Sequence, residues 1–239
     1  MSSWKQTLPP ITGDSVTIRE VVPADGPALF ELLADPRVSA HMSTPPPSVR
    51  AFEGFIAWAR GQREAGHGFC YGIVPHGLED AVGIIQLRTV DPSCAVAELG
   101  FAIGAAFWAT GVFVEAANLL ARFAFETLGT HRLEARVTPT NGRGNGVLQK
   151  LGANVEAVLS KSLAREGRFE EQFLWSLTAD AWRQRTLDRP LFSPLDAKSR
   201  IADAVSQTQD MLKSAKPSTS SSDAPLYPFF ITQSRPSTT

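Results

Sequence analysis

Three residues stand out because their types and positions could serve binding or catalysis. Gly111 lies in "FWATGVFVEA", where a polar lead-in gives way to a long apolar run. A glycine there permits a sharp turn before a helix, although such a turn is often only a connector. Glu98 lies in the apolar run "AVAELGFAIG", where its carboxylate could move a proton or form a salt bridge. Asn141 precedes a short helical pattern, where asparagine commonly caps the helix.

The cysteines and histidines do not have the spacing of a metal site. Cys70 and Cys94 stand alone, and the four histidines are scattered along the chain. A histidine such as His131, beside an arginine at the start of a strand, is more often a surface residue than a catalytic one. We therefore expect no metal, and two free thiols are typical of a reducing cytoplasm.

The composition indicates one globular domain with an extension. A chain of 239 residues, 43% of them hydrophobic, can bury one substantial core. The 23 basic and 24 acidic residues give a net charge of -1, so no overall field attracts nucleic acid or acidic lipid. The N-terminus lacks the apolar region of a secretory signal, and no apolar stretch approaches the about 18 residues of a membrane span. We expect a cytoplasmic protein without a membrane or nucleic-acid partner.

Alternating and helical patterns then give the elements that must position these residues. Strands are expected at Val16–Val21, Phe69–Val74, Ala81–Arg88, Ala95–Gly104, His131–Val137, "VEAVLSKSL" and "FEEQFLWSL". Helices are expected after Pro23, after Ser48, at Val112–Leu128 and at Asn141–Leu151. The predicted order is β-α-α-β-β-β-α-β-α-β-β, with the second, third and fourth strands forming an antiparallel meander.

Three stretches together resemble a known family. "AELGFAIGAAFWATGVFVEA", "FAFETLGTHRLEARVTPTNGRGNGVLQKLGA" and "VLSKSLAREGRFEEQFLWSL" are similar to the GNAT superfamily of acetyl-CoA dependent N-acetyltransferases, in its ribosomal-protein-type (RimJ/RimL-like) branch. The likeness spans about Asp14 to Trp182. It implies an α/β (α+β) GNAT domain over residues 14–182, with a central, mostly antiparallel twisted sheet, followed by an extension over residues 183–239.

The resemblance also implies a binding site for acetyl-CoA. The turn before the helix would donate backbone N–H groups to the pyrophosphate, and the preceding strand would pair with the pantetheine arm. In this chain the expected cofactor-binding residues are Phe101, Ala102, Ile103, Ala109, Thr110, Gly111, Val112, Phe113, Val114, Asn141 and Asn145. The chain departs from the family at Thr110, where a basic or small residue is common, and at Phe113, where a small residue is common. Thr110 can donate a hydroxyl hydrogen bond, but one positive charge for the pyrophosphate is missing.

The expected catalytic residues are Glu98 and Asn141. Glu98 would take the amine proton directly or through a water, unless it is only a salt-bridge carboxylate. Asn141 would hold the sulfur region, unless it is only a helix cap. The family positions that commonly carry a tyrosine or serine acid hold Leu148 and Gly144 here, so the thiolate leaves without a dedicated acid.

The predicted activity is transfer of an acetyl group to a primary amine by direct attack in a ternary complex. The leading acceptor is the α-amine of a protein or peptide, and a small-molecule amine such as an antibiotic comes second. A third alternative is a catalytically silent module that binds acetyl-CoA. The acceptor side in this fold includes the region of His41, and the last hairpin contributes Arg165, Arg168 and Glu170. A homodimer is compatible with these features.

The last fifty residues lie outside the resemblance. Ser193 and Pro194 are typical of a helix start, and an apolar stripe follows at Ile201, Val205, Thr208 and Leu212. This predicts an amphipathic helix outside the core, then a Ser/Pro linker and the aromatic cluster "LYPFFI", which either docks on a surface or is a frayed end. All the cofactor motifs precede this extension, so its removal is expected to leave cofactor affinity nearly intact.

Overall fold

A single eight-stranded sheet forms the centre of the computed structural model, which describes residues 3–42, 45–91, 93–165, 167–188 and 195–214. Its strands are β1 Ile11–Thr12, β2 Val16–Glu20, β3 Gly68–Pro75, β4 Gly83–Thr89, β5 Val96–Ile103, β6 Arg132–Val137, β7 Asn154–Arg165 and β8 Arg168–Thr178. The helices are α1 Gly26–Leu33, α2 Pro36–Ser39, α3 Val49–Ala65, α4 Val112–Arg122, α5 Gly142–Leu151, α6 Ala179–Asp188 and α7 Leu195–Ser214.

The sheet is antiparallel at every strand pair except one. The strand order is β1-β2-β3-β4-β5-β6-β8-β7, and only β5 and β6 are parallel. Two consecutive parallel strands need a crossover connection, and α4 supplies it. The predicted α/β class, the mostly antiparallel sheet and the antiparallel meander of β3, β4 and β5 are confirmed.

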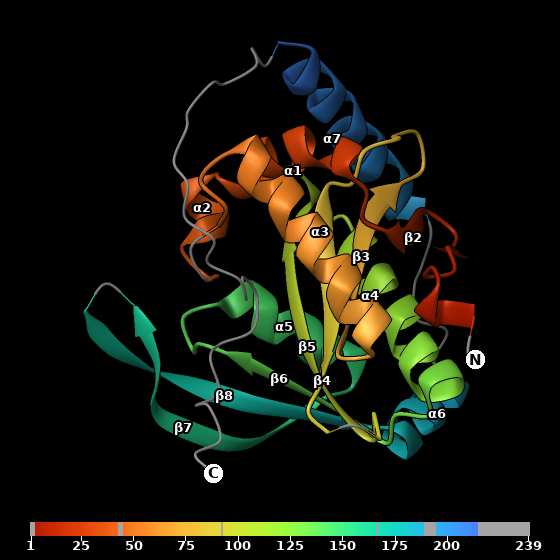
Figure 1. The fold of residues 1–239 in the computed structure, drawn as a ribbon, viewed down its shortest axis with the longest axis vertical. Helices are drawn as coiled ribbons and strands as arrows, with labels where there is room; N and C mark the ends of the chain where they lie inside the picture. Colours follow the sequence, from red (N-terminus) through yellow and green to blue (C-terminus); the bar gives the residue numbers. More distant parts are fainter. Residues whose placement is uncertain (1–2, 43–44, 92, 166, 189–194, 215–239) are drawn as a thin grey trace.

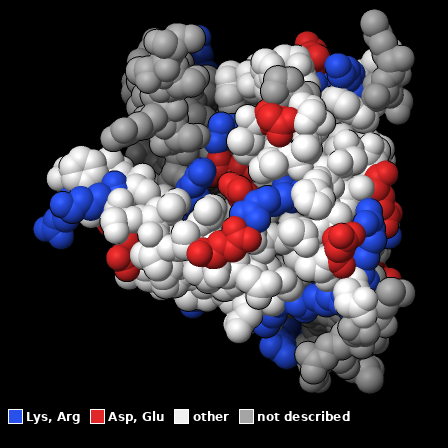
Figure 2. All heavy atoms as spheres, turned by 90° about the horizontal axis from the view of Figure 1, so that it is seen from below, with Lys and Arg blue, Asp and Glu red and all other residues white. Residues whose placement is uncertain are grey.

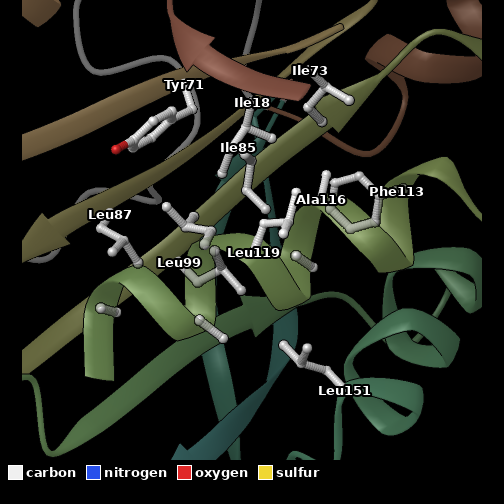
Figure 3. Packing of buried hydrophobic residues seen from close by; sticks show 14 of the residues in the cluster. Ile18, Tyr71, Ile73, Ile85, Leu87, Leu99, Phe113, Ala116, Leu119 and Leu151 are labelled. Atoms are coloured by element: carbon white, nitrogen blue, oxygen red, sulfur yellow. The ribbon is translucent and has the colours of Figure 1, made fainter. Parts of the chain in front are cut away.

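Side chains alternate between two faces of the sheet, and each face has its own apolar core. Ile85 of β4 faces α4, whereas the adjacent Ile84 faces α3. Figure 3 shows Leu119 of α4 pointing at the sheet beside Leu99 and Ile85. On the opposite face, α1 and α3 cover the sheet (Figure 1), and Phe52, Phe55 and Ile56 of α3 are fully buried there. The sheet therefore has helices on both faces, which explains the nearly continuous apolar runs of β3 and β4.

One buried carboxylate fixes the start of α1 to the sheet. Asp25 is fully buried, and its two oxygens accept hydrogen bonds from Arg19 at 2.7 and 2.8 Å. The backbone N–H groups of Val22 and Ala81 donate to the same carboxylate at 2.8 and 3.0 Å. Every oxygen lone pair that burial would otherwise leave unpaired thus has a donor. Asp25 joins β2, the first helix and the β3–β4 turn into one unit.

Several elements differ from the sequence-based expectation. The helix expected over Val112–Leu128 is α-helical only to Arg122, continues as a π-helical turn over Phe123–Leu128 and ends at Gly129. The strand β1 and the helices α2 and α6 were not expected, because each is short or weakly patterned. The expected domain boundary at residues 182 and 183 falls inside α6.

The C-terminal helix also differs from its expected place. It does not lie outside the core, because Ile201 and Ala204 are buried within the main apolar cluster on the α4 face of the sheet. The apolar stripe predicted for it is the surface that packs. Its expected start at Ser193 and Pro194 and the aromatic cluster at 226–231 lie outside the described residues.

Acidic and basic side chains are mixed on the described surface. The face shown in Figure 2 carries acidic and basic side chains next to one another, as the near-equal counts of the two signs suggest. Over the part of the chain that the structure describes, no helix has both the length and the apolarity to cross a bilayer.

Replacement of Asp25 by alanine tests the link between α1 and the sheet. The substitution leaves the Arg19 guanidinium and two backbone N–H groups without their acceptor, so the free energy of unfolding should fall by about 3–5 kcal/mol. Urea denaturation of both proteins measures it. The matched control is Asp180→Ala, which removes an exposed Arg183 ion pair and should cost less than about 1 kcal/mol. Equal losses in the two variants would contradict the role of Asp25.

Candidate active site

The parallel strands β5 and β6 separate after three paired residues. Their register joins Val96 to Arg132, Ala97 to Leu133 and Glu98 to Glu134, and no pairing continues beyond that point. Figure 1 shows the two strands diverging, with α5 beside the opening. A gap of this kind in the middle of a sheet exposes backbone hydrogen-bonding groups that a neighbouring strand would otherwise occupy.

The backbone direction along β5 shows which groups face this gap. Gly104 donates its N–H to Val82, and the carbonyl of Val96 accepts from Val90, so even-numbered residues of β5 point at β4. Strand geometry alternates, and the backbone groups of Leu99, Phe101 and Ile103 therefore point toward the gap. The backbone of Ala102 faces β4 instead. An extended ligand lying in the gap would find donors and acceptors at every second residue of β5.

A strained turn carries the chain from β5 into α4. Ala109 has φ 58°, which is uncommon for a residue with a side chain, and Gly111 has φ 95°. Gly111 occupies the N-cap position of α4, and no side chain caps the helix. The N–H of Val112 donates to Oγ1 of Thr110 at 3.4 Å, so the next N–H groups, those of Phe113 and Val114, are the ones left for an anion, which the helix dipole favours there.

A cavity of about 650 Å³ joins the gap, this turn and α5. Its basic residues come from four separate elements. They are Arg37, Arg143, Lys150, Arg185 and Arg200. Among the described residues, no aspartate or glutamate lines it. The chain as a whole has a net charge of -1, so the positive lining is a local property that suits an anionic ligand.

Most of the expected cofactor-binding residues lie at this cavity. The lining includes Phe101, Ala102, Ile103, Ala109, Thr110, Gly111, Phe113, Val114 and Asn141. Phe101 and Phe113 also contact each other, with ring centroids 4.8 Å apart. The structure thus brings together the strand, the turn and the helix start that the sequence selected.

Three of the expected residues make contacts within the protein, and their part in cofactor binding stays a prediction. The side chain of Val112 is fully buried in the core. Asn145 does not line the cavity, because its amide accepts from Trp175 at 2.9 Å and donates to Thr138 at 3.0 Å. Thr110 lies at the cavity, but its hydroxyl donates to the carbonyl of Phe107 at 2.8 Å. The hydroxyl donor expected at Thr110 therefore stabilises the turn instead of remaining available to a ligand.

Asn141 caps α5 at the inner end of the cavity. Its Oδ1 accepts from the N–H of Gly144 at 2.9 Å, which is the helix-cap alternative that the sequence left open. A Cβ atom on Gly144 would lie 2.8 Å from Nδ2 of Asn141, so a larger residue there would have to displace the capping side chain. Asn141 also lines the cavity, and a contact of its Nδ2 with the ligand stays a prediction.

A smaller cavity of about 50 Å³ continues from the large one toward the last hairpin. His41, Met42, Phe101 and Asn141 line both cavities and mark where they meet. Arg165 of β7 donates to the carbonyls of Ala40 and Met42, the latter at 3.1 Å, and so holds the segment that carries His41. The region of the first helices and the last hairpin forms this end of the site, as the resemblance implied.

His41 is suited to be uncharged at neutral pH. Partial burial, with the positive charges of Arg165 and Arg143, lowers the pKa of its imidazole below the usual 6.5, and Glu170 only partly opposes this. A neutral imidazole has a free nitrogen lone pair that can accept a proton.

Glu98 is placed in an ion-pair network instead of at the cavity. Its carboxylate accepts from Nη1 of Arg136 at 2.6 Å and from Nη2 of Arg88, and its side chain is only 3% exposed. It lines neither cavity. This geometry supports the salt-bridge alternative, because both oxygens already have cationic partners. A base role for Glu98 stays a prediction.

All five of the cavity's cations were missed from sequence. Arg143 and Lys150 are seven residues apart on α5 and share a face, a signal that a search for basic pairs beside Asn141 could have found. Arg143 also stacks over Trp108 at 4.1 Å. Arg185 and Arg200 belong to α6 and α7, and only tertiary packing brings them to the site. In the described residues no group of three potential ligands is arranged to hold a metal.

The chain belongs to the GNAT acetyltransferase family. The model of the acetyltransferase (GNAT) domain matches residues 15–154, which contain β5, the Gly111 turn, α4 and α5. Members of this family use acetyl-CoA, and the protein is an N-acetyltransferase.

Its relatives place it near the ribosomal-protein branch. It is 25% identical over 165 residues to an uncharacterized N-acetyltransferase p20 of Bacillus licheniformis, covering 69% of this chain and 93% of that protein. It is 23% identical to the [ribosomal protein uS5]-alanine N-acetyltransferase of Escherichia coli, covering 76% and 98%. The structure of Mycobacterium smegmatis RimJ with CoA-disulfide has the same fold, with TM-score 0.65, 19% identity and coverage of 82% and 93%.

Replacement of Gly111 by aspartate tests the turn. The substitution forces a side chain into a left-handed backbone position and adds an anion where the cavity is positive, so the Kd for CoA should rise by at least about 100-fold. The control is Gly129→Asp, which changes a glycine of φ 73° with open space around it and away from the cavity. Titration calorimetry should find normal affinity in that control. Unchanged affinity in a folded Gly111→Asp protein would contradict the site.

Proposed function

We propose that the protein acetylates the α-amine of a protein or peptide N-terminus, using acetyl-CoA bound in the 650 Å³ cavity. The observation that carries this proposal is the combination of an opened sheet with a cavity lined by cations and no described acid. CoA matches both parts, because its pantetheine arm is an extended, amide-bearing chain and its phosphates are anions. The relative that acetylates uS5 supports the choice of acceptor.

The gap beside β5 and the N-terminus of α4 would bind different parts of acetyl-CoA. The gap-facing backbone of Phe101 and Ile103 would pair with the pantetheine amides, and the N-terminus of α4 would hold the pyrophosphate. The acetyl end would then lie near Phe101 and Asn141, where the large cavity meets the smaller one. The acceptor would enter through the smaller cavity, between His41 and the last hairpin.

The chemistry is a direct transfer between the two bound substrates. Acetyl-CoA supplies the acetyl thioester. A backbone N–H of β5 facing the gap would polarise the thioester carbonyl by a hydrogen bond. The amine nitrogen forms the new C–N bond, the C–S bond breaks, and the thiolate takes a proton from solvent. Neither Cys70 nor Cys94 lines the cavities, so a covalent acetyl-enzyme is not part of this route.

His41 is the group best placed to take the proton that the amine loses. It lies at the junction of the two cavities, and its lowered pKa keeps it neutral at pH 7. An α-amine has a pKa of about 7.7–8.0, so roughly a tenth of it is already deprotonated at pH 7, against about 0.04% of a lysine. A weak, partly solvated base is therefore enough for an α-amine but not for a lysine.

A panel of acceptors tests the proposed substrate. A peptide with a free N-terminus should release free CoA at pH 7 at least about 100-fold faster than the same peptide with a blocked N-terminus and one free lysine, from the deprotonated fractions alone. Polyamines and aminoglycosides complete the panel. A faster rate with any of these small amines would instead indicate a small-molecule acetyltransferase. Acetyl-CoA binding without turnover on any amine would indicate a silent binding module.

The pH dependence of His41→Gln tests the proposed base. The variant keeps a polar side chain but cannot accept the proton, so kcat/KM at pH 7 should fall by up to about tenfold, because about a tenth of the α-amine is already deprotonated at that pH. The loss should shrink as pH rises toward the pKa of the acceptor amine, because more of the amine then arrives deprotonated.

Glu98→Gln is the comparison in the same experiment. As an ion-pair residue it should lose stability and keep the pH profile of the wild type. A loss of rate in Glu98→Gln with an unchanged profile in His41→Gln would transfer the base role to Glu98.

A further inference from the structure

The C-terminal helix α7 is docked onto the catalytic domain. Ile201 and Ala204 are buried in the main core cluster, and Val205 and Met211 pack against it. Gln209 donates to the carbonyl of Gly77 at 3.0 Å, which joins the helix to the β3–β4 turn. In Figure 1 α7 lies along the end of the sheet where β2 and β3 meet the loops.

This docking brings one cation of the extension to the cofactor turn. Nη1 of Arg200 donates to the carbonyl of Ala109 at 3.2 Å. Arg200 lines the same cavity as Thr110, Gly111 and Val114, beside the uncapped start of α4. The side chain is exposed, so a ligand entering the cavity can reach it.

The turn itself lacks a cation of its own. Between Ala105 and Val114 the chain contains no lysine or arginine, and the hydroxyl of Thr110 is already used by Phe107. A pyrophosphate at this turn would therefore meet backbone N–H groups but no positive charge from the turn.

We propose that α7 completes the cofactor site, with Arg200 binding a phosphate group of CoA in place of the charge that the turn lacks. A guanidinium donates several hydrogen bonds at once, so it can keep its bond to Ala109 while it contacts a phosphate. The same residue then does two things, since it steadies the strained Ala109 backbone and binds the anion. This inference rests on acetyl-CoA binding in the cavity, and it revises the expectation that removing the extension leaves cofactor affinity intact.

Arg200→Gln in the full-length chain is the variant that tests this role. It removes the charge and keeps a polar side chain on an exposed helix position. The Kd for acetyl-CoA, measured by titration calorimetry at about 0.05 M salt, should rise by about 10- to 100-fold. The matched control is Lys198→Gln, an exposed cation two residues earlier on α7 that does not line the cavity, and its Kd should stay within about twofold.

Salt dependence separates a phosphate contact from a purely structural role. Screening weakens charge interactions, so the ratio of variant to wild-type Kd should shrink at about 0.5 M salt. A residue that only steadies the Ala109 turn would give a ratio that does not change with salt, and that result would overturn the proposal. Equal affinities of Arg200→Gln and wild type at low salt would overturn it as well.

Two further ligands complete the test. With 3′-dephospho-CoA, the ratio of variant to wild-type Kd locates the contact. A ratio as large as with acetyl-CoA assigns Arg200 to the pyrophosphate, and a ratio near one assigns it to the 3′-phosphate. Acetyl-pantetheine has no phosphates, and both proteins should bind it equally. If the wild type binds no acetyl-CoA at all, the proposed function fails. If the wild type binds and Arg200→Gln binds equally, only the role of α7 fails.

Discussion

The separation of β5 from β6 is the feature on which the rest of the site depends. Parallel pairing ends after three residues, so the backbone groups of Leu99, Phe101 and Ile103 face a gap instead of a strand. Unpaired backbone groups in the middle of a sheet are costly unless water or a ligand satisfies them. Beside the gap, α5 and its cap at Asn141 follow β6, and the Gly111 turn follows β5.

Charge and backbone geometry act together at this opening. Gly111, with φ 95°, is the N-cap residue of α4 and lines the cavity, so this helix begins beside the cavity. Cations from α2, α5, α6 and α7 line the same cavity, and no described acid lines it. In contrast, the carboxylates of Glu98 and Asp25 are ion-paired with arginines, and these pairs stabilise the fold. The cavity thus has a cationic lining, whereas the buried carboxylates of Glu98 and Asp25 stabilise the fold.

The sequence predicted the parts of the site that are local in the chain. The β5 strand, the Gly111 turn and Asn141 follow from alternation, a glycine before a helix and a capping asparagine, and each pattern is short-range. The sequence could not predict the hydrogen bond between Asn145 and Trp175, because it joins α5 to a strand thirty residues later. It also could not decide between the two roles of Glu98, since both partners lie on other strands. Arg200 was missed for the same reason, as the packing of α7 alone brings it to the turn.

The central claim is that acetyl-CoA occupies the gap and the turn together. Amide hydrogen exchange, followed residue by residue with and without saturating acetyl-CoA, tests it directly because it reports on the backbone groups that the account invokes. The N–H groups of Phe101 and Ile103 and of the first turn of α4 should become strongly protected, while those at the far edge of the sheet in β2 should not change. Protection confined to other regions, with these amides exchanging as before, would contradict the account.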